Sequence, residues 1–304
     1  MNEASSTRQV RLLGQPTLGR YLEFVQDSVV GGESLDGTEL VDEWRVANDC
    51  YGELERDEAG LADDIEVFDL DSSLRPLVEE VMEDSRYRVT FDRLPTRFAM
   101  VELDHLVLYQ THVDLDFSEA LQGRLGPSPD AERLFRFCMP PESPAESVQI
   151  RRMGENRFVF ASESTDFRAH EPTLLEPEQI SGFDTFGPLS GMVGLGVGFG
   201  SNFLTAIRAE GRVLLHNGYH RAHAMRALGI THAPCILQSV SRLDELEIVA
   251  KSVVLKDPDF YFGTARPPLL KDFFDSRMRR EYSVHRTRKV IEVTFDIQDY
   301  RVRM

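Results

Sequence analysis

The sequence predicts an α+β fold, in which a mixed sheet is flanked by helices. Residues 212–237 are predicted to form a strand, a glycine turn, a short helix and a second strand. Apolar runs at residues 98–108 and 157–161 predict further strands. Apolar residues with helical spacing between positions 40 and 47 predict a helix in the N-terminal part of the chain.

Composition divides the chain into three segments. Residues 1–87 are strongly acidic and are expected to form a helical N-terminal segment. Residues 88–240 are expected to form the mixed-sheet domain, opened by a strand at 88–91 and interrupted by an insertion at about 138–185 that begins at a proline cluster. Residues 241–304 are expected to form a helical extension that ends in a strand.

The rest of the chain is organised around residues 212–229. Asn217-Gly218 is a tight-turn dipeptide between an apolar strand and an alanine-rich helix, and Gly229 fits the position just after the helix ends. The first backbone N–H groups of a helix lack partners within it, and its dipole favours anions at that end. His220 and Arg221 fall in the first turn, where they could add charge-assisted donors. This pattern predicts an anion-binding turn.

The same residues carry a resemblance to a known family. Asn217-Gly218-Tyr219-His220-Arg221, followed by a helix ending in Leu228-Gly229, resembles the phosphate-binding signature of the ParB/sulfiredoxin superfamily. In that superfamily a Gly-x-[His/Arg]-Arg turn holds nucleotide phosphates, and its members include CTP-using partition proteins, sulfiredoxins, free-serine kinases and nucleases. The resemblance implies the superfamily's mixed sheet, ATP, ADP or CTP as cofactor, Mg²⁺, and a small-molecule substrate.

Two departures from the family patterns narrow the activity that the resemblance implies. Tyr219 stands where sulfiredoxins have their nucleophilic cysteine, so sulfinic-acid repair is not expected. The glutamate of the partition-protein motif Gly-Glu-Arg-Arg is also missing. The motif is most similar to the kinase-like Gly-His-His-Arg version. The alternative is an ordinary strand–turn–helix connection with a surface histidine and arginine.

The candidate site residues follow from the motif and from this resemblance. The expected nucleotide ligands are Gln110, Asn217, Gly218, Tyr219, His220, Arg221 and His223. The expected catalytic residues are Glu102, Asp104, His220 and Asp272, with one carboxylate holding Mg²⁺ or acting as a base. Ordinary strand-edge polarity, for Glu102 and Asp104, and a helix cap, for Asp272, are the alternatives. No metal site built from protein ligands alone is predicted, because His216, His220 and His223 lie on both sides of a turn.

The net charge and the cysteine content limit which partners and which cellular location are expected. The net charge is −17, from 34 basic and 51 acidic residues, and a field of that sign opposes nucleic acid. Three scattered cysteines indicate a reducing compartment, and no apolar run has membrane length. We therefore expect a cytoplasmic protein without a membrane partner. It could form a homo-oligomer.

A glycine-rich stretch at residues 191–200 has two interpretations. Gly194, Gly196, Gly198 and Gly200 would share one face of a strand and allow close packing. In a loop, they would form a flap over the phosphate site.

The leading functional hypothesis is therefore a nucleotide-binding enzyme that transfers or hydrolyses a phosphoryl group on a small molecule. A non-enzymatic, nucleotide-dependent switch of the ParB type is the first alternative, and a ParB-like nuclease is the second. The sequence does not identify the acceptor.

Overall fold

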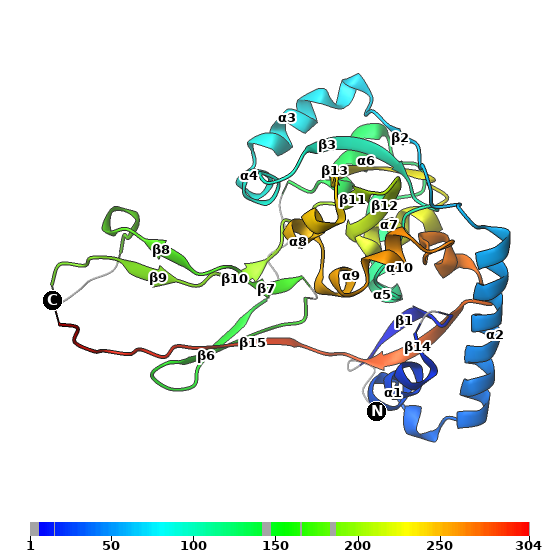
Figure 1. The fold of residues 1–304 in the computed structure, drawn as a ribbon, viewed down its shortest axis with the longest axis horizontal. Helices are drawn as coiled ribbons and strands as arrows, with labels where there is room; N and C mark the ends of the chain where they lie inside the picture. The colour runs from blue at the N-terminus through cyan, green and yellow to red at the C-terminus, as the bar shows by residue number, and fades with distance from the viewer. Residues whose placement is uncertain (1–5, 15, 142–146, 165, 183–186, 304) are drawn as a thin grey trace. The chain divides into compact units, whose positions relative to one another are not determined.

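The computed structural model describes residues 6–14, 16–141, 147–164, 166–182 and 187–303 (Figure 1). The chain divides into two compact units, which are described separately. The first unit contains Met1–Glu142 and Ser201–His285, and the second contains Ser143–Gly200 and Arg286–Met304. This division differs from the three segments expected from composition, because the first unit contains most of the residues of each of the three segments.

A five-stranded sheet forms the centre of the first unit, in the order β12-β11-β13-β3-β2. Its strands are β2 (Val67–Phe68), β3 (Thr96–Glu102), β11 (Thr205–Ala209), β12 (Arg212–Asn217) and β13 (His232–Ser239). β11 and β13 run parallel, whereas the other neighbours are antiparallel. The sheet is therefore mixed, and the predicted α+β class with flanking helices is confirmed.

Helices cover both faces of this sheet, so its central strands are apolar on both sides. One face packs against α5 (Leu115–Leu125), α6 (Ala131–Cys138) and α7 (Tyr219–Ala227). The other face packs against α8 (Leu246–Val249), α9 (Ser252–Lys256) and α10 (Pro258–Phe262). Val213 and Leu215 of β12 enter the first core and Leu214 enters the second, which explains the continuous apolar run of this strand.

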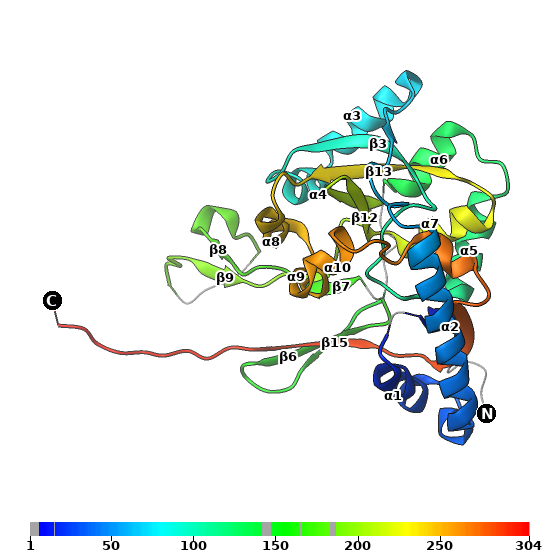
Figure 2. The same ribbon diagram turned by 45° about the vertical axis from the view of Figure 1, so that its right-hand side comes forward.

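A second sheet of the first unit joins distant parts of the chain, in the order β14-β1-β4. Its strands are β1 (Ser6–Leu12), β4 (His112–Asp114) and β14 (Arg279–His285). Tyr282 and Val284 of β14 pack with residues of α1 (Leu18–Ser28) and α2 (Gly37–Asp57) in a separate core. The helices α1 and α2 lie side by side (Figure 2). The remaining helices are α3 (Arg75–Glu83) and α4 (Ser85–Thr90), and the short 3₁₀ turns include η6 (Leu270–Phe274).

The predicted strand, turn, helix and strand at 212–237 are confirmed as β12, the Gly218 turn, α7 and β13. Gly229 follows the end of α7 with φ of 81°, as expected for a residue after a helix C-cap. The strand predicted at 88–91 is wrong, because these residues belong to α4 and the turn after it. The Asp84 side chain accepts a hydrogen bond from Arg86 N and caps α4, so a local cap outweighs strand propensity here.

The second unit consists of short antiparallel strands. β15 (Lys289–Thr294), β6 (Arg157–Ser162) and β5 (Gln149–Arg152) form one sheet. The other pairs are β7 (Phe167–Ala169) with β10 (Val197–Phe199), and β8 (Thr173–Leu175) with β9 (Met192–Gly194).

The glycine-rich stretch lies within these strand pairs. A Cβ atom added at Gly196 or Gly198 would touch the His170 ring, and one at Gly194 would touch Leu175. These are ordinary contact distances, and the stretch is divided between β9 and β10, with Gly196 between the two strands and Gly200 after them, so the four glycines do not share the face of a single strand. Among the described residues, no helix combines the length and apolar character that crossing a membrane requires.

Candidate functional site

The turn between β12 and α7 has the backbone conformation that the motif predicted. Gly218 has φ of 100° and ψ of 27°, in the left-handed region where glycine is favoured. A Cβ atom at this position would also overlap Leu204 Cδ1. Within the described chain, no side chain caps the N-terminus of α7. Glycine is therefore required at position 218 for both its backbone angles and its packing.

Two polar residues of the motif, Asn217 and Arg221, form hydrogen bonds within the protein. Asn217 Nδ2 donates to the carbonyl oxygen of Phe203 at 2.9 Å. Arg221 is only 7% exposed, and its Nη1 donates to the carbonyl oxygens of Cys138 at 3.0 Å and Phe137 at 3.4 Å. Arg221 thus holds the carbonyl end of α6 in this structure, where a positive group is favourable.

Tyr219 anchors the turn to the segment between β3 and β4. Its hydroxyl donates to Leu215 O at 2.7 Å and accepts from the backbone N–H of Tyr109 at 3.2 Å. Burial raises the pKa of the Tyr219 phenol well above its usual value. Gln110 follows Tyr109; its backbone interacts with the Tyr219 hydroxyl, and its Nε2 donates to His112 O at 2.8 Å. Tyr219 contributes hydrogen bonds that fix the turn, and its hydroxyl stays neutral at pH 7.

His220 differs from its expected electrostatic role. Burial lowers its pKa to about 4, Asp114 acts in the opposite direction and Arg221 lowers it further. Its ring meets that of Phe117 edge to face, with centroids 5.2 Å apart. At pH 7 His220 is therefore a neutral imidazole, and Arg221 is the cation of this turn.

Two more histidines lie close to His220: His223 is buried, and His112 is half-buried, as His220 is. Burial lowers the pKa of His223 to about 4, with smaller effects from His220 and Arg279. Its Nδ1 lies 2.8 Å from the Ser118 hydroxyl, and its ring stacks on Phe274. Burial likewise lowers the pKa of His112 to about 4, aided by Arg11 and His220. The first turns of α7 therefore carry two neutral imidazoles, His220 and His223, and a third, His112, lies close to them in β4.

The predicted carboxylates lie elsewhere. Asp104 forms an ion pair with Arg226 in the last turn of α7, at the opposite end of the helix from Gly218. Glu102 pairs with His105 Nδ1 at 2.8 Å. Asp272 is 1% exposed and binds the buried Arg266. The structure thus brings Gln110, the Gly218 turn and His223 together, and it places these three carboxylates in other contacts.

Sequence reasoning missed three residues of this region. His112 lies in β4, and Ser118 and Phe117 lie in α5, in segments where no motif marked them. They reach α7 only through the packing of α5 and β4 against it, which no local pattern predicts. Ser118 is fully buried, an unusual environment for a serine.

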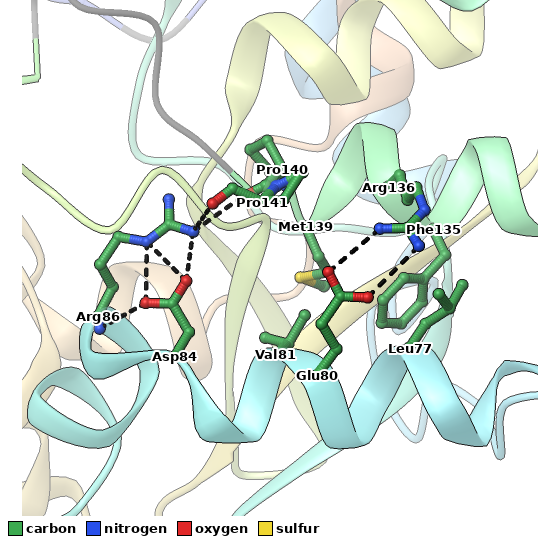
Figure 3. Close-up of a pocket in the computed structure, with 10 residues that line it drawn as sticks. All are labelled: Leu77, Glu80, Val81, Asp84, Arg86, Phe135, Arg136, Met139, Pro140 and Pro141. Carbon is green, nitrogen blue, oxygen red and sulfur yellow. Dashed lines mark hydrogen bonds and ion pairs between the residues drawn. The ribbon is translucent and has the colours of Figure 1, made fainter.

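Two hollows lie on the surface of the first unit. One, of about 70 Å³, lies between α3 and the end of α6, where Glu80 pairs with Arg136 and Asp84 with Arg86 (Figure 3). The other is a shallow hollow of about 450 Å³ beside α5 and α6, with Phe137 in its lining. The first is too small for a nucleotide, since ligand sites usually enclose roughly 300–1,000 Å³. No residue of the Gly218 turn lines either hollow.

Comparison with family models, curated proteins and solved structures finds no match to this chain.

Proposed function

We propose that this protein is a nucleotide-binding enzyme that transfers or hydrolyses a phosphoryl group on a small molecule, with the Gly218 turn holding the phosphates. One observation carries the proposal: Gly218, in a left-handed conformation, joins a buried strand to a nine-residue helix whose first turn contains His220 and Arg221. Such a turn directs backbone N–H groups and the positive end of the helix dipole toward one place.

The residues of the turn have distinct roles in this proposal. Arg221 supplies the charge that pairs with a phosphate. His220 donates a hydrogen bond from a neutral ring, and an approaching phosphate raises its pKa because opposite charge favours the protonated form. Phosphate binding is then accompanied by proton uptake, and it strengthens as the pH falls from the raised pKa of His220 toward the value of about 4 in the free protein.

The protein's own residues fit the expected Mg²⁺ site poorly. Mg²⁺ takes oxygen ligands, often one or two carboxylates together with substrate phosphates. Asp104 and Asp272 are occupied by arginines, and in the described part of the chain no three metal-ligating side chains gather. We therefore assign no protein ligand to Mg²⁺, which in this proposal enters with the nucleotide.

Calorimetry with ATP, ADP and CTP, each with Mg²⁺, tests the proposal. Arg221→Ala should weaken binding by roughly 1.5–3 kcal/mol, the range for hydrogen bonds to charged groups. Arg226→Ala is the matched control, since it removes an arginine from the same helix at the opposite end. Circular dichroism checks that both variants are folded. Equal affinity of the wild type and a folded Arg221→Ala variant would show that the phosphate-binding assignment is wrong.

Two further measurements separate this proposal from its alternatives. Release of phosphate or formation of a phosphorylated product distinguishes an enzyme from a nucleotide-dependent switch. The net charge of −17 leads us to expect no nonspecific duplex binding at about 150 mM salt. A gel shift with micromolar or tighter affinity at that salt would favour the nuclease alternative instead.

A further inference from the structure

The chain leaves the first unit and returns to it through two neighbouring segments. Residues 137–141, which begin in the last turn of α6, lead out, and residues 201–204 lead back to β11. We call these two segments the stem. Leu204 N donates to the carbonyl oxygen of Cys138 at 2.8 Å, so the two arms of the stem are hydrogen-bonded to each other. All of these residues belong to the first unit.

The Gly218 turn contacts both arms of the stem. Asn217 binds Phe203 O on the returning arm, and Arg221 binds Phe137 O and Cys138 O on the outgoing arm. Gly218 lies against Leu204 so closely that a Cβ atom would not fit. The candidate phosphate-binding residues are therefore the same residues that hold the stem.

A second arginine holds the stem from α4. Arg86 Nη2 donates to Pro140 O at 3.1 Å and to Pro141 O at 2.5 Å (Figure 3). Its guanidinium carbon lies 4.9 Å from the centre of the Phe203 ring, on the returning arm. Asp84 binds the same guanidinium and orients it. Arg86 thus bridges both arms without contacting the Gly218 turn through any of these bonds.

We propose that nucleotide binding at the Gly218 turn loosens the stem, so that occupancy of the turn is coupled to the opening of the hydrogen bonds that hold the two arms of the stem. This inference rests on the proposed function. Arg221 is nearly inaccessible, and its guanidinium points at the Phe137 and Cys138 carbonyls. A phosphate that takes Arg221 as a ligand draws it away from these carbonyls and weakens the hold on the outgoing arm.

The coupling is reciprocal, because two linked equilibria affect each other equally. If binding requires a looser stem, a variant with a looser stem binds more tightly. Arg86→Ala removes the bonds to Pro140 and Pro141 and leaves Arg221 in place. We expect Arg86→Ala to bind the nucleotide about fivefold or more tightly, in the usual range of coupling between sites.

Amide hydrogen exchange of the full-length wild type, with and without the Mg²⁺-nucleotide that gives the largest calorimetric signal, tests the inference. Peptides that contain Leu204 should exchange faster when the nucleotide is bound, because the bond from Leu204 N to Cys138 O opens more often. The β1 and β14 strands provide the internal reference, and their exchange should not change. Calorimetry on Arg86→Ala and on the Arg226→Ala control measures the reciprocal effect.

Each possible outcome either supports or overturns the proposed coupling. Faster exchange at Leu204 together with tighter binding by Arg86→Ala supports the coupling. Nucleotide binding with unchanged or slower exchange at Leu204 overturns the coupling and leaves the proposed function in place. Binding that Arg86→Ala leaves unchanged also overturns the coupling. Absence of nucleotide binding overturns the proposed function and the coupling with it.

Discussion

Both carboxylate oxygens of Asp272 accept hydrogen bonds from the guanidinium of Arg266, at 2.9 and 2.6 Å. Arg266 is fully buried, and Asp272 is 1% exposed. Asp272 also accepts from Leu269 N, and Glu58 is the second carboxylate on Arg266. A buried charge with this many partners is costly to separate from any one of them. The geometry therefore assigns Asp272 to the link between η6 and the segment before it, and gives its carboxylate no contact with the Gly218 turn.

We expect Asp272→Asn to destabilise the fold by about 3 kcal/mol, because it leaves a buried guanidinium short of one negative partner. Asp275→Asn is the control: Asp275 pairs with the exposed Arg277, and such pairs contribute about 1 kcal/mol or less. Urea unfolding followed by circular dichroism gives both values. Equal unfolding midpoints for the two variants would contradict the assignment.

The three cysteines are expected to be unreactive in the folded protein. Cys50, Cys138 and Cys235 are all buried, and burial raises the pKa of Cys138 to about 12. Only the thiolate is a strong nucleophile, so both access and ionisation oppose reaction. A chromogenic disulfide reagent should label the native protein at a small fraction of the rate seen in urea. Rapid labelling of one thiol without unfolding would reopen a thiol-based mechanism.

The buried and half-buried histidines around α7 predict a specific loss of stability in acid. The pKa of His112, His220 and His223 falls from 6.5 to about 4 on folding, so the unfolded chain binds more protons between those values. The stability contributed by these neutral rings is complete above pH 6.5 and is lost as the pH falls toward 4. Each unit of pKa shift corresponds to about 1.4 kcal/mol. We therefore expect a loss of several kcal/mol over this interval.

Matched histidine variants separate this effect from the titration of carboxylates. His223→Gln keeps a hydrogen-bonding group beside Ser118 and removes the titration, so its stability should fall less between pH 6.5 and 4 than that of the wild type. His285→Gln changes an exposed histidine of the same unit and should follow the wild type. Parallel curves for His223→Gln and the wild type would mean that His223 is not protonated on unfolding.

Local signals predicted the motif well because its conformation depends on near neighbours. Gly218 and Gly229 have the positive φ values that glycine favours, and the apolar run of β12 follows from burial on both faces. The strand predicted at 88–91 failed for a local reason as well. Val89 is 79% exposed, and the cap at Asp84 starts a helix there. Strand propensity of single residues is a weak guide when a cap competes with it.

The electrostatics of the site could not be predicted from the sequence. The charge state of His220 depends on burial by α5 and β4, and the partner of Arg221 is the end of α6, about eighty residues away. The pairing of β1 with β14 likewise joins the two ends of the first unit. Such contacts arise from the packing of distant segments, and composition or periodicity carries no information on them. The motif therefore predicted the conformation of the turn but not the state of its side chains.

Gly218 and Gly229 provide a comparison that isolates the role of packing at the turn. Both have positive φ, but a Cβ atom would overlap Leu204 at position 218, and no heavy atom lies within 4 Å of it at position 229. Gly229→Ala should therefore cost only the left-handed backbone strain, about 1–2 kcal/mol. Gly218→Ala should cost more, because the same strain is joined by displacement of Leu204 on the stem.

The additional loss of stability expected for Gly218→Ala, relative to Gly229→Ala, should depend on Leu204. In a double-mutant cycle, Leu204→Ala removes the overlapping Cδ1 atom, so the double variant should be more stable than the sum of the two single changes predicts. Urea unfolding at pH 7 measures the four proteins, and calorimetry with the Mg²⁺-nucleotide measures their binding. If the two changes are additive within about 0.5 kcal/mol, Leu204 and Gly218 are energetically independent. The contact between the turn and the returning arm of the stem would then contribute nothing to the coupling.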